Sequence, residues 1–264
     1  MKTKFALALA ASALLATTAH ANPFINGGFE TGNFNDWTVS DSAYRNSINN
    51  TNLTPTWVFA NDNYAMHSQI ISAGTIDPRV GAAFGSTVYS GNYSARIEDT
   101  TTGGYASAIK QTVTGYTESS INFVWKAVLE GAHGITDAAT FKLVLTDLTT
   151  GLVEISREYN AASGGGGIDS RFSYSGGNYY TPDWQIETLN ITDALQGHDF
   201  MLSLVAADCQ PTGHRGYVYL DGFGSVAGGG GDGTDPNAVP EPATLAMLGL
   251  GLLGMTATRR RKAA

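Results

Sequence analysis

The chain has 264 residues, a formal net charge of −8 and a single cysteine, Cys209. An acidic chain lacks the basic face that a phosphate backbone requires, so we expect no nucleic-acid partner. A single cysteine excludes an intrachain disulfide, and the length is sufficient for one sizeable hydrophobic core.

Residues 1–21 have the pattern of a secretory signal peptide. Lys2 and Lys4 form a basic start, residues 5–16 form a short apolar run, and Ala19-His20-Ala21 is a small-x-small cleavage site. The run is too short for a stable membrane-spanning helix. We therefore expect the mature chain to begin at Asn22.

Residues 22–226 are predicted to form one β-rich domain. In residues 120–130, Phe123 and Trp125 lie on an apolar face, whereas Asn122 and Lys126 lie on the other. This period of two is typical of a strand and places Trp125 in the core. Further strands are predicted at residues 105–113, 141–147, 152–159, 184–191, 200–207 and 216–226. Many short strands joined by polar turns indicate an all-β fold, an antiparallel β-sandwich.

Most of the acidic residues belong to this central part of the chain. Residues 22–239 contain nine basic and 22 acidic residues, because six of the 15 basic residues lie in the two terminal segments. Such a surface favours cations as partners, and calcium is the expected one.

A glycine-rich stretch, residues 227–238, is predicted to be a flexible linker to the tail, residues 239–264. The tail opens with an extended acidic tripeptide, Pro240, Glu241 and Pro242. Residues 243–258 follow as an uncharged apolar run, about 24 Å long as a helix. The tail ends with four cations, Arg259, Arg260, Arg261 and Lys262. The positive-inside rule predicts that these cations stay in the cytoplasm.

This tail resembles the PEP-CTERM sorting signal of Gram-negative bacteria. Proteins with that signal are exported, held briefly at the inner membrane and cut near Pro-Glu-Pro by an exosortase. They often belong to organisms that make exopolysaccharide. The resemblance implies an exosortase substrate with a C-terminal transmembrane sorting helix, destined for the cell surface or extracellular matrix. The alternatives are an ordinary membrane anchor and a buried core helix, and the closing basic block argues against the latter.

The two ends of the predicted domain carry short motifs. Residues 26–30 read NGGFE, and residues 216–223 read GYVYLDGF. This pairing resembles the jelly-roll sandwiches of carbohydrate-binding modules and galactose-binding-like domains. The resemblance implies that Glu30 and Asp221 share a structural calcium ion, helped by backbone carbonyls near Asn26 and Gly28. The alternative is that both carboxylates only bind the backbone of turns.

Aromatic side chains are the candidates for contact with a sugar, because a flat apolar ring with a polar tip suits the C–H face of a sugar. Trp37, Trp57 and Trp184 lie near polar turns, as do Tyr179 and Tyr180. Core packing is the alternative for each of them.

Enzyme motifs are missing from the sequence. It has no His-Glu-x-x-His, no Gly-x-Ser-x-Gly and no phosphate loop. Cys209 and His214 are five positions apart, but a catalytic pair would need a third orienting group, so we favour a buried thiol and a loop histidine. A glycosidase would use two carboxylates from Glu130, Asp183, Glu187 and Asp208. The sequence selects no pair, so no catalytic residue is assigned.

The sequence thus predicts an exported, non-catalytic surface or matrix protein that binds glycan or contributes structure in exopolysaccharide or biofilm. A matrix-modifying glycoside hydrolase and a purely structural adhesin are the alternatives.

Overall fold

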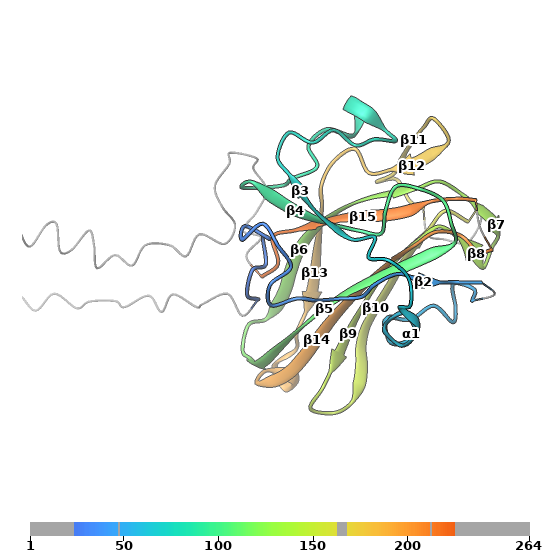
Figure 1. The fold of residues 1–264 in the computed structure, drawn as a ribbon. Helices are drawn as coiled ribbons and strands as arrows, with labels where there is room; N and C mark the ends of the chain where they lie inside the picture. Colours follow the sequence, from blue (N-terminus) through green and yellow to red (C-terminus); the bar gives the residue numbers. More distant parts are fainter. Residues whose placement is uncertain (1–23, 47, 163–167, 212, 225–264) are drawn as a thin grey trace, which may run out of the picture. The chain divides into compact units, whose positions relative to one another are not determined.

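The computed structural model describes residues 24–46, 48–162, 168–211 and 213–224 (Figure 1). The strands of one sheet, sheet A, are β1 (Thr38–Val39), β2 (Ala43–Tyr44), β5 (Tyr105–Tyr116), β9 (Thr140–Asp147), β10 (Leu152–Asn160) and β14 (His198–Ala207). Those of the other, sheet B, are β3 (Gln69–Ser72), β4 (Tyr93–Ile97), β6 (Ser120–Leu129), β11 (Ser173–Ser175), β12 (Asn178–Tyr180), β13 (Gln185–Asn190) and β15 (Gly216–Asp221). The remaining elements are a short ladder of β7 (Ala132–Gly134) with β8 (Asp137–Ala138), and the helices α1 (Pro55–Asn61), η1 (Gly81–Phe84) and η2 (Asp193–Leu195).

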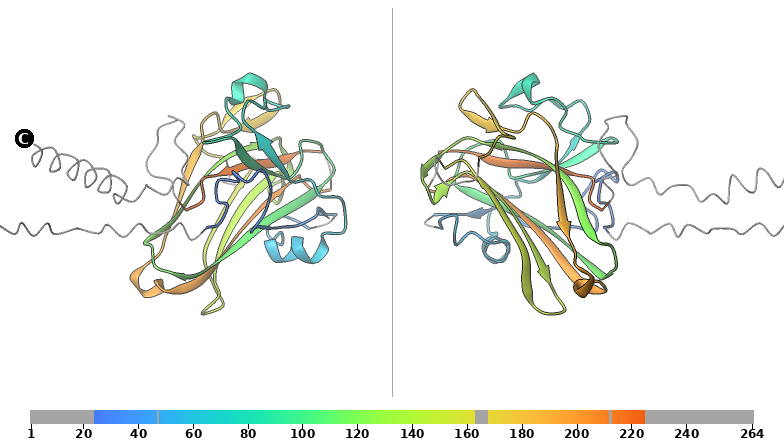
Figure 2. Two further views of the ribbon diagram at one scale, coloured as in Figure 1. Left: turned by 60° about the vertical axis from the view of Figure 1, so that its left-hand side comes forward. Right: turned by 180° about the vertical axis from the view of Figure 1, so that it is seen from behind.

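Sheets A and B pack face to face, and their strand pairs are antiparallel (Figures 1 and 2). Sheet A has the order β1-β5-β14-β9-β10, and β2 also pairs with β5. Sheet B has the order β11-β12-β6-β15-β4-β3, and β13 also pairs with β6. The antiparallel β-sandwich predicted from the strand pattern is therefore confirmed.

Each strand predicted from the sequence has a counterpart, with small differences at the ends. The last one is shorter than predicted, because β15 ends at Asp221. Helix α1 was not predicted, since seven residues are too few to show a helical period. Its start has a local cause: the Thr54 hydroxyl accepts a hydrogen bond from the amide of Trp57, and Pro55 occupies the first turn.

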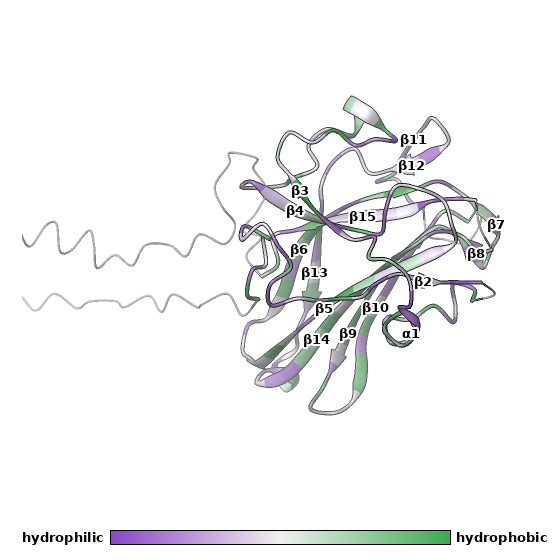
Figure 3. Cartoon of the chain, viewed as in Figure 1, coloured by the Kyte–Doolittle hydropathy of each residue, from purple (hydrophilic) through white to green (hydrophobic). Residues whose placement is uncertain are grey.

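The main core lies between the sheets and is rich in aromatic rings. Trp125, on β6, is fully buried, as predicted, and packs against Phe141 and Tyr159 at ring-centroid distances of 5.4 and 4.7 Å. Strands β5, β6 and β14 supply many of the hydrophobic residues (green in Figure 3). Residues buried this fully contribute about 1.5–3 kcal/mol each to stability, so the core is the main source of the folding energy.

The outer face of sheet B is covered by the chain segment before β4. Lys126, on β6, is almost completely buried there, and its ammonium group donates to the backbone oxygens of Phe84 and Ser86. Burial lowers the pKa of Lys126 to about 8. The Asp77 carboxylate accepts hydrogen bonds from the hydroxyls of Tyr217 and Tyr219 on β15. The polar face predicted for β6 is thus an internal surface.

The first and last described segments of the chain, around Phe24 and Phe223, meet in rings that belong to the main core. Trp37 packs against Phe29 and Phe223, with centroids 5.5 and 4.7 Å apart, and Phe24 lies 5.9 Å from Phe223. The backbone amide of Phe223 donates to the oxygen of Gly27 at 3.0 Å. These contacts place the NGGFE segment beside the end of the last strand, as the end motifs suggested.

The predicted signal peptide, residues 1–21, the glycine-rich linker and the sorting tail lie outside the described residues. Within the described part of the chain, no helix is long and apolar enough to cross a membrane.

We predict that Gly27→Ala destabilises the fold by about 1–3 kcal/mol, because the new methyl group would overpack a tight contact. A Cβ atom at this position would lie 2.5 Å from the backbone oxygen of Phe223. Gly134→Ala is the control, since its Cβ would approach the Asp137 carboxylate no closer than 3.5 Å. Urea unfolding measures both changes, and equal stabilities for the two variants would contradict the assigned role of the Gly27 contact.

Candidate functional site

The Asp208 carboxylate organises one end of the sandwich, where β14 passes into β15. It accepts hydrogen bonds from the amides of Gly104 and Tyr105 at 3.1 and 3.3 Å, and from Gly216 at 3.1 Å. The buried guanidinium of Arg45 donates to the backbone oxygen of Asp208. Burial raises the pKa of Asp208 to about 8, and the nearby Glu98 charge adds to the shift. The start of β5 and the β14–β15 turn are therefore held together.

Three tyrosine rings gather at this end, and we call Tyr44, Tyr64 and Tyr105 the tyrosine cluster. The Tyr105 centroid lies 5.6 Å from that of Tyr44 and 5.2 Å from that of Tyr64. Tyr44 and Tyr64 are 38% and 47% exposed, so apolar ring surface faces the solvent. No hydrogen bond of the three hydroxyls is found among the residues that the structure describes.

Two glycines make room for these rings. A Cβ atom at Gly103 would lie 2.5 Å from a ring carbon of Tyr105. At Gly104 it would lie 2.3 Å from the Pro211 backbone oxygen and 3.5 Å from the Tyr44 ring. Gly104 also has a positive φ of 73°, which favours glycine. The backbone here therefore permits the close approach of the rings.

A histidine and two carboxylates border the tyrosine cluster. The His67 ring packs edge-to-face on Tyr105 at 5.0 Å, and its Nδ1 lies 2.5 Å from the Glu98 carboxylate and 3.6 Å from that of Asp99. The bond to Glu98 raises the pKa of His67. Glu98 is buried and also accepts from the Ser107 hydroxyl at 2.8 Å. Two half-buried polar side chains, His67 and Asp99, thus lie beside the rings, whereas Glu98 holds them from inside.

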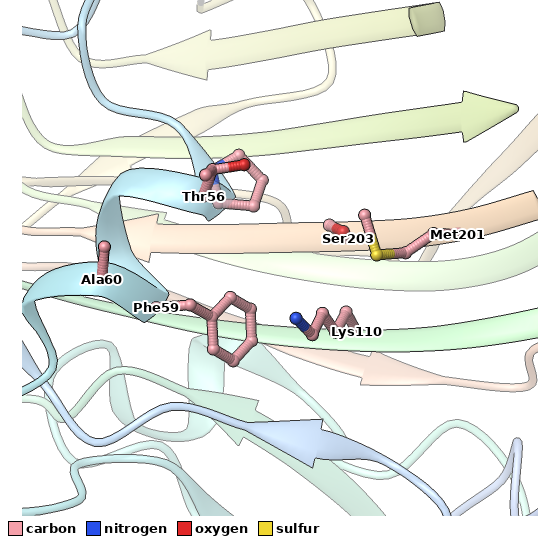
Figure 4. A pocket seen from close by; sticks show the side chains of 7 residues that line it. Thr56, Phe59, Ala60, Lys110, Met201 and Ser203 are labelled. Atoms are coloured by element: carbon pink, nitrogen blue, oxygen red, sulfur yellow. The ribbon is translucent and has the colours of Figure 1, made fainter. Parts of the chain in front are cut away.

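A pocket of about 240 Å³ lies between α1 and the outer face of sheet A (Figure 4). Phe59 and Thr56 come from the helix, and Lys110, Met201 and Ser203 come from β5 and β14. The Lys110 ammonium group covers the Phe59 ring at 4.1 Å. The Ser203 hydroxyl is buried and has no hydrogen-bond partner among the described residues. The lining thus combines apolar side chains with a few polar groups, and Lys110 covers the Phe59 ring.

The structure separates the three tryptophans predicted to contact a sugar. Trp37 is 7% exposed, and its indole N–H donates to the Asn26 backbone oxygen at 3.1 Å. Trp37 is therefore a core residue and not the sugar-binding platform that was predicted. Trp57 is half-buried on α1 against the small cluster around Leu53. Trp184 is half-buried beside Tyr89, at 5.8 Å. The three rings lie in three different places, because Trp37 belongs to the main core, Trp57 packs on the cluster around Leu53, and Trp184 packs on the cluster outside sheet B.

Tyr179 and Tyr180 lie on β12, away from the tyrosine cluster. Tyr180 is buried in the outer cluster of sheet B, whereas Tyr179 packs on the exposed Tyr174 at 4.8 Å.

The structure brings Glu30 and Asp221 to the same chain segment, residues 89–93. The Glu30 carboxylate accepts from the amides of Asn92 and Tyr93 at 3.0–3.1 Å. The Asp221 carboxylate accepts from Tyr89 and Ser90 at 3.0 and 3.3 Å. Burial raises the pKa of Asp221, and the Glu30 charge contributes to that shift. Two oxygen donors that repel each other beside a backbone turn fit a hard cation, although backbone hydrogen bonds already serve both groups.

The four carboxylates considered for hydrolysis are dispersed. Glu187 accepts from the Trp125 indole N–H and the Tyr159 hydroxyl, whereas Glu130 pairs with Arg215 at 3.3 Å. Asp208 binds backbone amides, as described above. Within the described ranges, no hydrogen bond joins any two of Glu130, Asp183, Glu187 and Asp208.

Cys209 and His214 are brought together by the β14–β15 turn. The Cys209 Sγ lies 3.1 Å from His214 Nδ1. The thiol is fully buried, as predicted, and burial raises its pKa to about 11. An activated nucleophile requires the opposite shift.

The C-terminal segment of the chain matches a family model. Residues 238–262 match the family model of the PEP-CTERM protein-sorting motif, which confirms the recognition of the tail from its three parts. No curated protein matches the chain.

Several solved structures are similar to the chain at low identity. TmCBM61 in complex with β-1,4-galactotriose is 15% identical, with a TM-score of 0.40, over 76% of this chain and 95% of that one. CBM28, a carbohydrate-binding module specific for non-crystalline cellulose, is 14% identical, with a TM-score of 0.36, over 76% and 92%. The enzymatically active domain of bacteriophage CBA120 tailspike protein 4 is 12% identical, with a TM-score of 0.36, over 78% and 21%.

Proposed function

We propose that this protein is an exported, exosortase-sorted glycan-binding protein of the cell surface or extracellular matrix of a Gram-negative bacterium. The observation that carries the binding role is the tyrosine cluster. Its rings expose apolar faces, and the tyrosine hydroxyls, His67 and the half-buried Asp99 supply hydrogen bonds. Saccharides combine C–H faces with many hydroxyls, so this surface matches their chemistry.

The ligand class follows from the shape of the site. The tyrosine cluster is an exposed surface, so it suits a polymer passing over it better than an enclosed small molecule. Extracellular polysaccharide is therefore the proposed partner, in exopolysaccharide or biofilm. Binding without turnover is the proposed mode, because three of the four carboxylates considered for hydrolysis, Glu130, Glu187 and Asp208, bind groups of the protein itself.

We predict that Tyr64→Ala and Tyr44→Ala each weaken binding of the purified protein to the host's exopolysaccharide about tenfold, equivalent to about 1.4 kcal/mol. Each substitution removes an exposed ring face while leaving the buried core intact. Affinity electrophoresis in gels containing the polymer measures the change. Tyr174→Ala is the matched control, because Tyr174 is 64% exposed but lies on β11.

Other outcomes of the same experiment have distinct meanings. Loss of binding in Lys110→Gln, but not in Tyr64→Ala, would place the glycan in the pocket under α1. Release of new reducing ends from the polymer would establish the hydrolase alternative. If the polymer neither retains the protein nor releases new reducing ends, the structural adhesin is the remaining alternative.

Sorting is the second part of the proposal, and it is supported by the match at residues 238–262. We propose that residues 243–258 anchor the chain briefly in the inner membrane before an exosortase cuts near Pro240-Glu241-Pro242. Mass spectrometry of the extracellular protein is expected to find no peptide from residues 259–262. Replacing the Pro-Glu-Pro tripeptide by three alanines is expected to retain the protein in the membrane fraction. Recovery of the intact tail outside the cell would contradict this route.

A structural calcium ion is the third part of the proposal. Glu30 and Asp221 would hold it. The ion would neutralise their mutual repulsion and join the first and last segments of the domain's chain. Because a ligand of the folded state stabilises that state, we predict that the calcium chelator EGTA lowers the Tm of the purified protein. Glu30→Gln is expected to have a lower Tm without calcium dependence. An unchanged Tm of the native protein in EGTA would contradict the calcium site and would show that Glu30 and Asp221 serve only as acceptors of backbone hydrogen bonds.

A further inference from the structure

A cysteine and two histidines meet at the turn between β14 and β15, outside the proposed glycan and calcium sites. The Cys209 Sγ lies 3.2 Å from His133 Nδ1 and 3.1 Å from His214 Nδ1. The two imidazole rings lie 4.7 Å apart. One donor atom from each residue lies within 4.8 Å of the others, so the three side chains converge on one point.

The backbone fixes two of these side chains before any ligand arrives. The Cys209 amide donates to the His214 oxygen at 2.8 Å, and the His214 amide donates to the Cys209 sulfur at 3.2 Å. These two bonds close the turn between the residues. A hydrogen bond from an N–H group to sulfur stabilises the negative charge of a thiolate. Such a bond also orients the sulfur as a metal ligand.

The third side chain comes from a separate element. His133 lies on β7, and its Nδ1 is also 3.2 Å from the Gln210 backbone oxygen. A Cβ atom at Gly131 would lie 2.9 Å from the His214 ring, so glycine is needed for that ring to occupy its place. Cys209 is buried, His214 half-buried and His133 exposed. The cluster therefore has a closed inner side and a side open to the solvent.

The chemistry of these donors selects the ligand. One thiolate and two imidazoles suit Zn²⁺ or Cu²⁺, whereas calcium requires oxygen donors. Zinc bonds of about 2.3 Å to sulfur and 2.0–2.1 Å to nitrogen, at a tetrahedral angle, separate sulfur and nitrogen by about 3.5 Å. The two observed sulfur–nitrogen separations, 3.1 and 3.2 Å, lie within a few tenths of an ångström of this value.

We propose that Cys209, His133 and His214 bind one divalent transition-metal ion of the zinc–copper class, with the fourth position open to the solvent. Binding forms one metal–sulfur and two metal–nitrogen bonds and releases the thiol proton to the solvent. His133 then exchanges its contact with the Gln210 oxygen for the metal. The ion joins β7 to the β14–β15 turn, which Asp208 ties to the tyrosine cluster.

The test is a titration of the metal-stripped, purified protein with Co²⁺, whose thiolate complexes absorb in the near ultraviolet. One equivalent is expected to produce this charge-transfer band, and Zn²⁺ is expected to abolish it by displacement. A parallel titration with Cu²⁺, followed by competition with Zn²⁺, identifies the preferred ion. Cys209→Ser is expected to lose the band, and His133→Gln and His214→Gln are expected to weaken binding at least tenfold.

Controls separate this site from adventitious binding and from loss of the fold. His198→Gln is the matched histidine variant, since His198 pairs with Asp147 on a different part of sheet A, and it is expected to bind Co²⁺ normally. His133 is exposed, so His133→Gln is expected to fold normally, and Zn²⁺ should raise the Tm of the native protein but not of this variant. No thiolate band at one equivalent, or an equal band in Cys209→Ser, would overturn the proposal.

Discussion

The position of the candidate sites depends on one buried carboxylate. Asp208 accepts hydrogen bonds from the amides of Gly104, Tyr105 and Gly216, so it connects the start of β5 to the start of β15. Its neighbour Cys209 is placed by the same turn, and Tyr105 is the central ring of the tyrosine cluster. Removing a buried group of this kind leaves several backbone amides without a partner, each at a cost of about 1–3 kcal/mol. Both candidate sites would therefore be disturbed together.

Two other carboxylates, Glu30 and Asp221, organise the opposite end of the sandwich. Strand β15 runs from Gly216 to Asp221, and six residues at about 3.3 Å each separate the two ends by roughly 17–20 Å. Asp221 and Glu30 bind the same turn there, beside the rings of Phe29, Trp37 and Phe223. Each end of the last strand thus has its own polar anchor, while the middle of the sandwich is held by hydrophobic contact.

Much of the fold could be predicted from local patterns, because alternating residues define strands whatever their partners are. Residues 120–130 identified both β6 and the burial of Trp125 in this way. The second face of β6 was not predictable as internal, because Lys126 is covered by residues distant in sequence. The recognition of the sorting tail needed no tertiary structure, since its three parts follow one another directly.

The sites were harder to predict, because their members come from distant parts of the chain. Tyr64 follows the polar stretch Asn61-Asp62-Asn63, and an aromatic residue in such a loop was a usable signal. No local pattern, however, shows that Tyr44 and Tyr105 approach it. The spacing of Cys209 and His214 suggested a pair, but His133 joins them only through the pairing of β7 and β8. Trp37 was misjudged because a neighbouring polar turn does not determine which way an indole ring points.

The two chain ends of the domain lie close together, and this has a practical consequence. Phe24 and Phe223 are in ring contact at 5.9 Å, so the chain enters and leaves the sandwich at nearly the same point. Such an arrangement favours circular permutation and insertion into a loop of another protein, since joining the old ends requires only a short bridge. The tyrosine cluster and the Cys209 turn lie at the far end of β15, so a host protein carrying the grafted domain would leave both surfaces uncovered.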